Sequence, residues 1–349
     1  MPTLEPITDK HLWDSFMARV QPSTFIHSWT WGTFEHELGR EIIRFGVFDD
    51  QKKLRAIALA VKTVARRGTF LLCPHGPIID LGQGSEQEKE KEFETYIAIV
   101  LKELVRLGKE MKCDFVRIST PIIETPERVQ AFRKAGFRDA PIHVHSRISS
   151  ILDVTKPEQE LLALMKKNAR YGIRKAERDG IVVASSHKPE DLEIFWNIYQ
   201  ETVQNNSFVP YPKSFLDKEF RAFEKEGSAR WYFASHNGKV VSAAMIIFTP
   251  WSAFYHHGAS ARISGGITPS ELLQWRIIED AKAHGCKYYN FWGVVPDADE
   301  EHPWAGFSRF KKSFGGYAEH YVPAQDHPLT KKYFLTWAIE RFRKWKRGV

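Results

Sequence analysis

The order of predicted secondary-structure elements is the same in the two halves of the chain. Each half reads as helices, a hairpin of two strands, a third strand, a long helix and a final strand. In the first half these elements are predicted over 10–20, 30–38, 41–64, 69–74, 93–111 and 114–119. In the second half they follow a strand over 181–185 and lie over 189–204, 212–226, 229–248, 253–260, 268–285 and 287–294. This alternation predicts α/β (α+β) domains, with mixed central sheets flanked by helices.

The chain has 349 residues, which is long enough for two such domains. We expect the first over 1–147 and the second over 148–324, with the C-terminal helix within 325–349 packing back on the first. Local signals support the second: Asn237-Gly238 suits a hairpin turn that needs positive φ. Thr268 is the expected N-cap of the following helix, with Pro269 at its first position.

A basic stretch opens the second half. The sequence "LLALMKKNARYGIRKAERDG" (161–180) places Lys166, Arg170, Arg174 and Arg178 at every fourth position, with Glu177 as the one acid before Arg178. On one helix these like charges repel, which indicates either a solvated face or an anion-binding wall. The shortage of acids favours an anion-binding surface. Such a surface would be about 18 Å long and could contact more than one phosphate group.

A second basic feature ends the chain. Net charge is +7, and the last nineteen residues hold seven Lys/Arg against Glu340 alone. Phe334, Ala338, Phe342 and Trp345 share a face of this amphipathic tail. We expect the tail to dock its aromatic side chains on the body of the protein, and its basic face to remain available for anionic lipid or nucleic acid. No apolar run of membrane-spanning length and no signal-peptide pattern is seen, so a cytoplasmic location, with peripheral contact at the inner membrane face, is expected.

The element order resembles the GNAT acyltransferase fold, in which two splayed central strands hold an acyl donor. Acetyl-CoA enzymes of that fold need a Gly-rich pyrophosphate loop before the helix that follows the fourth strand. Arg262 and Gly265 fit that loop, but Ile267 replaces a required Gly or Ala, and Pro269 removes a backbone donor. Standard acetyl-CoA binding is therefore disfavoured.

Several segments in order also resemble the FemABX peptidyltransferases, which are tandem GNAT-fold enzymes. They are "TFIHSWTWGTF", "CPHGPIID", "KKNARYGIRKAERDGIVV", "FYHHGAS", "SELLQWRIIEDAKAHGCKYYNFWGV" and "GFSRFKKSFGG". Only "NNSFVPYPKS" stands where some members carry a coiled-coil arm, so the chain resembles a short, armless member.

The resemblance implies roles for individual residues. Lys311, with its neighbour Phe310, matches a lysine near the reaction centre, where an ammonium would stabilise the oxyanion. Arg178 matches an arginine that contacts precursor phosphate, and Tyr255, His257 and Trp292 are the expected substrate-contacting side chains of the second domain, together with Arg174, Arg170 and Lys166.

Three positions depart from the family pattern. His257 replaces a tyrosine of some relatives, and Glu35 or His36 stands where a phosphate-binding lysine can occur. His75 occupies a turn in which Arg or Lys is usual. These departures leave open whether the precursor is nucleotide-linked or lipid-linked.

The function implied is transfer of an amino acid from aminoacyl-tRNA to an amine of a peptidoglycan precursor's stem peptide, with no cofactor. Two alternatives remain: an acyl-CoA-type N-acyltransferase acting on another amine, and a non-catalytic protein that binds tRNA or a membrane. No metal site is expected, because the three cysteines are scattered without C-x-x-C spacing. His256 and His257, adjacent on a strand, should point to opposite faces, so that at most one faces the cleft. The acidic run Asp297, Asp299, Glu300 and Glu301 is interpreted as a solvated loop.

Overall fold

The computed structural model describes residues 1–20, 24–66, 68–206, 210–261, 266, 268–296 and 301–347. The chain forms two compact units. Unit 1 consists of Met1–Ile148, Glu301–Pro303 and His320–Val349, and unit 2 consists of Ser149–Glu300 and Trp304–Glu319. Unit 2 therefore ends at Glu319, five residues before the predicted end at 324, because the following segment joins the sheet of unit 1.

Unit 1 is built on one mixed sheet in the order β1-β2-β3-β4-β6-β15-β7, with β5 paired to β3. The strands β4 and β6 pair in parallel, and β15 pairs antiparallel with both β6 and β7. The bounds are β1 (Thr3–Pro6), β2 (Ile42–Phe48), β3 (Leu54–Ala65), β4 (Gly68–Pro74), β5 (Ile78–Ile79), β6 (Phe115–Ser119), β7 (Arg138–Asp139) and β15 (Gln325–Pro328).

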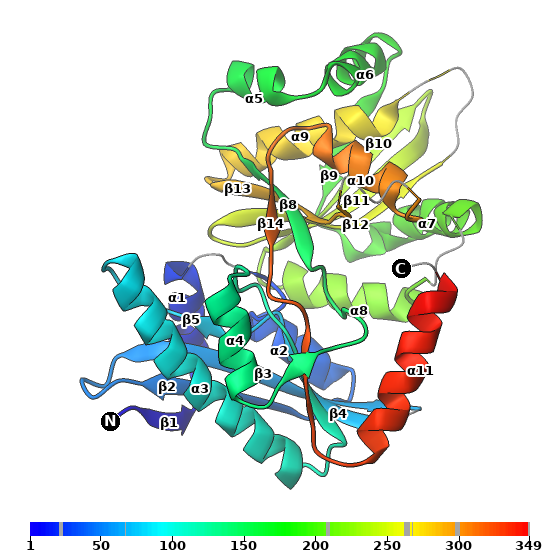
Figure 1. Cartoon of the computed structure of the whole chain (residues 1–349). Coiled ribbons are helices and arrows are strands. Elements are labelled where there is room, and N and C mark those ends of the chain that lie inside the picture. Colours follow the sequence, from blue (N-terminus) through cyan, green and yellow to red (C-terminus); the bar gives the residue numbers. More distant parts are fainter. Residues whose placement is uncertain are drawn as a thin grey trace. The chain divides into compact units, whose positions relative to one another are not determined.

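The helices of unit 1 cover this sheet, and α3 and α4 lie against each other (Figure 1). Their bounds are α1 (Lys10–Arg19), α2 (Trp29–Glu37), α3 (Glu86–Glu110), α4 (Pro126–Lys134) and α11 (Lys332–Arg347). A capping box between Ser85 and Glu88 starts α3. Apolar residues at helical spacing predict a buried side for this helix, and they are buried in the core: Phe93, Ile97, Val100, Leu101, Leu104, Leu107 and Met111.

The C-terminal helix α11 is attached to unit 1 through a buried ion-pair network. Arg117 on β6 donates to both carboxylate oxygens of Asp326 at 2.7 and 2.8 Å and to Glu340 of α11 at 2.8 Å. The aromatic face predicted to dock is instead exposed: Phe334, Phe342 and Trp345 are 51%, 60% and 77% accessible. Tyr333 and Thr336 are the buried side chains, because the polar contact to Arg117 sets which side of α11 faces the sheet.

Unit 2 is a second mixed sheet, in the order β14-β8-β13-β12-β11-β10-β9. Positive φ at Asn237 and Gly238 confirms the predicted hairpin turn. The strands are β8 (Ile148–Asp153), β9 (Val182–Ser186), β10 (Ala229–His236), β11 (Lys239–Phe248), β12 (Ser252–Ser260), β13 (Tyr288–Gly293) and β14 (Tyr317–His320). The helices are α5 (Glu158–Leu164), α6 (Lys167–Arg178), α7 (Leu192–Asn206), α8 (Lys213–Glu224), α9 (Pro269–Ala283) and α10 (Ala305–Lys312).

The basic stretch forms two helices rather than one. The chain is extended at Met165 and Lys166, so α5 ends and α6 begins there (Figure 1). The Arg170 guanidinium donates back to the carbonyl oxygens of Ala163 and Met165, which satisfies acceptors at the end of α5. Helical spacing of the small and apolar residues predicts one buried side for the whole stretch, and these residues are buried: Leu161, Met165, Ala169, Gly172, Ile173 and Ala176.

Helix α6 packs closely on α9. A Cβ on Gly172 would lie 3.0 Å from Glu271 Cγ and 3.2 Å from Thr268 Oγ1, so glycine permits this approach. Thr268 is the N-cap residue of α9, as predicted, but its side chain makes no cap hydrogen bond. Its hydroxyl donates instead to the Gly172 carbonyl at 3.0 Å, which ties α9 to α6.

Candidate active site

The two central strands of unit 2 separate after a short parallel ladder. Strand β12 pairs with β13 at Ser252, Ala253 and Phe254, and the pairing stops at Phe254↔Asn290. Beyond this point Trp292 has φ of 67°, and its N–H donates to Asn290 Oδ1 at 2.8 Å. Non-glycine residues rarely adopt a positive φ, so the backbone at Trp292 is held in an uncommon left-handed conformation. It directs the Gly293 carbonyl toward α10.

Lys311 lies at this end of the ladder. Its side chain comes from α10, is 3% exposed, and donates from Nζ to the Gly293 carbonyl oxygen at 2.8 Å. Nζ also lies 4.4 Å from the centroid of the Phe307 ring and 5.9 Å from that of Tyr255. Burial lowers the pKa of Lys311 to about 7. The fold thus packs the Lys311 amine against two aromatic rings. Near neutral pH this amine can be either protonated or neutral.

Tyr255 lies beside Lys311, and the position of its ring depends on Gly258. A Cβ on Gly258 would lie 1.9 Å from Tyr255 Oη, so the ring occupies the space that any side chain would need. Burial raises the pKa of Tyr255. Phe310, by contrast, packs against the core of unit 2 and contacts Phe314 edge-on at 5.3 Å.

A buried carboxylate joins the two adjacent histidines. Glu219 on α8 is fully buried and accepts from His256 Nε2 and His257 Nε2, each at 2.8 Å. The prediction that the two rings point to opposite faces is wrong. A β-bulge in β12 places Tyr255 opposite Ile246 and His257 opposite Met245, which leaves His256 as the extra residue. Both rings therefore turn toward α8.

Electrostatics within this group are strongly perturbed. Burial by itself raises the pKa of Glu219, but the two adjacent histidines outweigh it and hold that pKa at about 2. Burial lowers the pKa of His257. The three residues place donor atoms within 4.8 Å of one another, so they are the described residues that could hold a metal ion. Trp292 lies beside them, edge-on to His256 at 6.3 Å between ring centroids.

Sequence reasoning missed Glu219. A signal was present, because Glu219 stands between Leu216, Phe220 and Phe223 on the buried side of α8. An acid on an apolar helix face requires a buried partner. The partners are invisible in the sequence, because they are brought there by the bulge in β12.

The predicted basic residues divide into two kinds. Lys166, Arg174 and Arg178 are exposed on α6 or at its start, whereas Arg170 is held by the carbonyls of α5. Among the described residues, no ion pair to Arg174 or Arg178 is found, and no hydrogen bond links any of the four to Lys311. The structure therefore gives unit 2 a basic surface on α6 that is separate from the contacts of Lys311.

The first-domain positions that depart from the family pattern are structural. Glu35 is buried and pairs with Arg40, and His75 is 2% exposed with Nδ1 at 2.8 Å from Thr24 Oγ1. Burial holds the pKa of His75 well below its usual value. Glu301 is exposed, whereas Arg262, Gly265, Ile267, Asp297, Asp299 and Glu300 lie outside the described residues.

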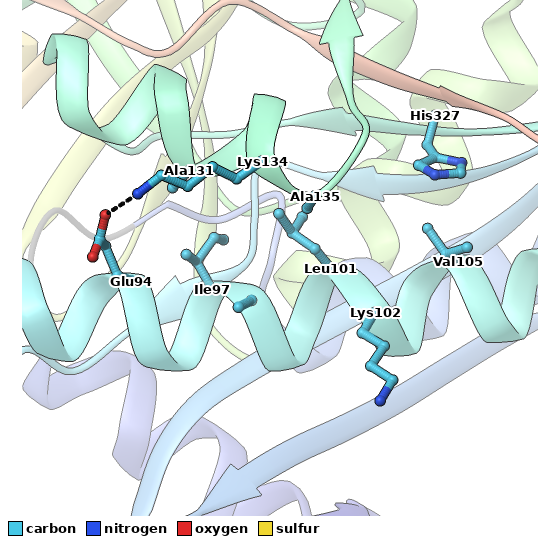
Figure 2. A pocket seen from close by; sticks show the side chains of 10 residues that line it. Glu94, Ile97, Leu101, Lys102, Val105, Ala131, Lys134, Ala135 and His327 are labelled. Carbon is cyan, nitrogen blue, oxygen red and sulfur yellow. Dashed lines mark hydrogen bonds and ion pairs between the residues drawn. The ribbon is translucent and has the colours of Figure 1, made fainter.

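Unit 1 carries a groove between α3 and α4 (Figure 2). Aliphatic side chains such as Ile97 and Leu101 line it, Lys134 pairs with Glu94 at 3.0 Å at one end, and His327 stands at the other. The groove contains none of the predicted site residues.

Comparisons with known proteins agree with this architecture. A profile of the acetyltransferase (GNAT) domain matches residues 163–312, which includes the separated strands and Lys311. The lipid II:glycine glycyltransferase of Staphylococcus saprophyticus is 20% identical over 389 aligned positions, covering 90% of this chain and 91% of that protein. The aminoacyltransferase FemA of Staphylococcus epidermidis is 31% identical over 91 residues, 26% of this chain and 22% of FemA.

A solved structure shares the fold over almost the full length. The crystal structure of FemX superposes with a TM-score of 0.81 and 18% identity, covering 97% of this chain and all of FemX. The chain therefore has the fold of two tandem GNAT-like domains, and it is similar over almost its whole length to the FemABX acyl- and aminoacyltransferases.

Proposed function

We propose that this protein transfers an aminoacyl group to an amine of a peptidoglycan precursor's stem peptide and so builds an interpeptide bridge. The observation that carries the proposal is Lys311, a buried amine at the point where β12 and β13 separate. It stands in a chain that aligns with 91% of a lipid II:glycine glycyltransferase. Lipid II is accordingly the proposed form of the acceptor.

The chemistry is aminolysis of an ester. The acceptor amine attacks the ester carbonyl, a C–N bond forms and the C–O bond to the donor breaks. The proton that the amine loses ends on the oxygen of the departing donor, which leaves as a hydroxyl. Protonated Lys311 donates one hydrogen to Gly293 and retains two, one of which is directed at the developing oxyanion. Because the ester is already activated, holding the two reactants together supplies much of the acceleration.

Aminoacyl-tRNA is the proposed donor. The exposed cations Lys166, Arg174 and Arg178 on α6 supply a surface for a phosphate backbone. The acyl-CoA alternative is less favoured, because Pro269 is the first residue of α9 and offers no N–H to a pyrophosphate at that helix terminus.

Purified protein tests the proposal directly. It is incubated with one of two donors, a mixture of charged tRNAs or acetyl-CoA. Each donor is combined with lipid-linked or nucleotide-linked precursor, and the mass of the precursor is measured by mass spectrometry. We expect the mass of one or more amino acids to be added to lipid-linked precursor in the presence of charged tRNA. Modification by acetyl-CoA alone would support the alternative, and no added mass with any donor would refute the transferase.

Peripheral membrane contact is proposed through α11. The rings of exposed Phe342 and Trp345 are tilted against each other with 5.8 Å between their centroids, and they stand among the lysines and arginines of the last turns. Aromatic and basic side chains together suit an anionic lipid surface. No helix of the described residues is long and apolar enough to span a membrane.

Vesicle sedimentation checks this contact. We expect binding to vesicles containing anionic lipid and little binding to neutral ones, and we expect the double substitution Phe342→Ala, Trp345→Ala to reduce it severalfold. Tyr171→Ala removes an exposed aromatic ring from α6 and is the matched control. Unchanged binding of the double variant would refute the role of α11.

A further inference from the structure

Glu219, His256 and His257, here called the Glu219 cluster, are the most unusual polar group of unit 2. Each carboxylate oxygen of Glu219 contacts one imidazole Nε2 at 2.8 Å. The cluster stands between a helix and a strand, α8 and β12, so its donors are held by regular elements. The proposed transfer reaction assigns no role to Glu219 or His256, and His257 is connected with substrate by the family resemblance alone.

The charge of the cluster calls for a cation. Glu219 is fully buried, and its ion-pair partners among the described residues are these two imidazoles. The Glu219 carboxylate is therefore held out of contact with water by two imidazole side chains, both of which offer a ring nitrogen to it. A buried carboxylate is stabilised by a cation placed against it.

The donor set identifies the kind of cation. Two imidazole nitrogens and one carboxylate suit Zn²⁺, Fe²⁺, Co²⁺ or Mn²⁺, whereas Mg²⁺ and Ca²⁺ prefer oxygen ligands. Ligands of one tetrahedral Zn²⁺ lie about 3.3 Å apart at bond lengths near 2.0–2.1 Å. The N···O distances are 2.8 Å and the three donor atoms lie within 4.8 Å of one another, so side-chain shifts would bring them to this spacing.

We propose that the Glu219 cluster is a binding site for a divalent transition-metal ion, with Zn²⁺ as the reference ion. The ligands are Nε2 of His256, Nε2 of His257 and the carboxylate of Glu219, and at least one coordination position remains for water. An ionised carboxylate only accepts hydrogen bonds, so Nε2 carries the proton of each ring that donates to it. On binding, that proton of a neutral ring moves to Nδ1 and Nε2 supplies its lone pair to the metal. This site is independent of the proposed function.

The experiment uses the full-length, tag-free protein after removal of metal with a chelator. Isothermal titration with Zn²⁺ should show one ion bound per chain, and Co²⁺ should give the visible absorption of a low-symmetry four- or five-coordinate site. His256→Ala should weaken Zn²⁺ binding by more than about 100-fold, because it removes a direct ligand. His236→Ala, on β10 of the same sheet, is the control and should bind as the wild type does.

A second readout guards against misfolded variants. Saturating Zn²⁺ should raise the melting temperature of the wild type and of His236→Ala, because the ion binds the folded state. It should leave His256→Ala and Glu219→Gln unchanged. Mg²⁺ should give no shift in any of them. Absence of saturable Zn²⁺ binding by the wild type, or equal binding by His256→Ala, would overturn the proposal and leave the cluster as a proton-sharing group.

Discussion

Lys311 is an ionisable side chain that the fold keeps away from water. Because burial lowers its pKa from 10.5 to about 7, the folded state disfavours the ammonium form. Below pH 7 the lysine is protonated in both folded and unfolded states, and the full penalty, on the order of a few kcal/mol, is present. Above pH 7 the folded lysine is neutral, so the penalty falls as the pH rises toward 10.5.

Lys311→Met should therefore stabilise the protein, and more so at low pH. We expect its melting temperature to exceed that of the wild type at pH 6.5, with the difference shrinking by pH 9.5. Lys312→Met at the neighbouring position reports general effects of pH. A difference that grows with pH would contradict the burial of a charged Lys311.

Gly258 controls the position of Tyr255 next to Lys311. Gly258→Ala would place a methyl group 1.9 Å from Tyr255 Oη, so the ring must move. We expect a loss of stability of about 1–3 kcal/mol in denaturant unfolding and a lower rate of transfer. Gly306→Ala on α10 is the control, because the nearest atom to its Cβ lies 3.9 Å away. Equal stability of the two variants would show that the ring has room.

The family resemblance singles out Lys311 and Tyr255 separately, because both stand in quoted motifs, and the structure places them 5.9 Å apart from Nζ to ring centroid. Glu219 and the shared orientation of His256 and His257 were not predicted. Strand alternation assumes a regular ladder, and one bulged residue reverses the face of every side chain after it. Nothing in the residue types of β12 announces that bulge.

Helix α6 shows how one row of like charges separates into two roles. Arg170 serves the end of α5, whereas Arg174 and Arg178 face solvent. The apolar period of this segment predicts its buried side correctly but passes over the break at Met165 and Lys166. That break depends on tertiary hydrogen bonds, including one from the Lys166 N–H to the Ser313 carbonyl at 2.8 Å.

Substitutions on α6 should separate these roles. The double substitution Arg174→Ala, Arg178→Ala should weaken tRNA binding severalfold and flatten its salt dependence, because two phosphate contacts are lost. Arg170→Ala should instead cost about 1–2 kcal/mol of stability, through the carbonyls it leaves unpaired, with little effect on tRNA binding. Filter binding across a salt series and denaturant unfolding measure the two effects. Equal tRNA affinity of the double variant and the wild type would show that these two arginines are solvated and do not bind tRNA.

A segment near the C-terminus completes the sheet of unit 1, which is otherwise formed by the first part of the chain. Strand β15 inserts between β6 and β7, and Arg117 reaches Asp326 across 209 positions of sequence. Element order predicts the two domains, because each periodic segment carries its own signal. The return of the C-terminal segment to the first domain is predicted and confirmed. The strand β15 and its partners β6 and β7 were not predicted, since four residues of strand carry too little pattern to specify a partner so far away.

Breaking this long-range pair should destabilise unit 1. Asp326→Ala leaves the buried Arg117 without its bidentate partner, which should cost about 3–5 kcal/mol. Lys134→Ala removes an exposed pair with Glu94 and should cost less than about 1 kcal/mol. Urea unfolding compares the two, and a similar small cost for both would mean that the network contributes little.

The proposed function depends on a role of Lys311 in aminoacyl transfer. The most direct measurement is the single-turnover rate of amino acid transfer from charged tRNA to lipid-linked precursor, for wild type, Lys311→Ala and Lys312→Ala. We predict a loss of about 100-fold or more for Lys311→Ala, as expected for an oxyanion-stabilising group. Lys312, which donates to the Val295 carbonyl at 2.8 Å, should be replaceable with a small effect. Equal rates for all three proteins would contradict a role of Lys311 in the transfer reaction.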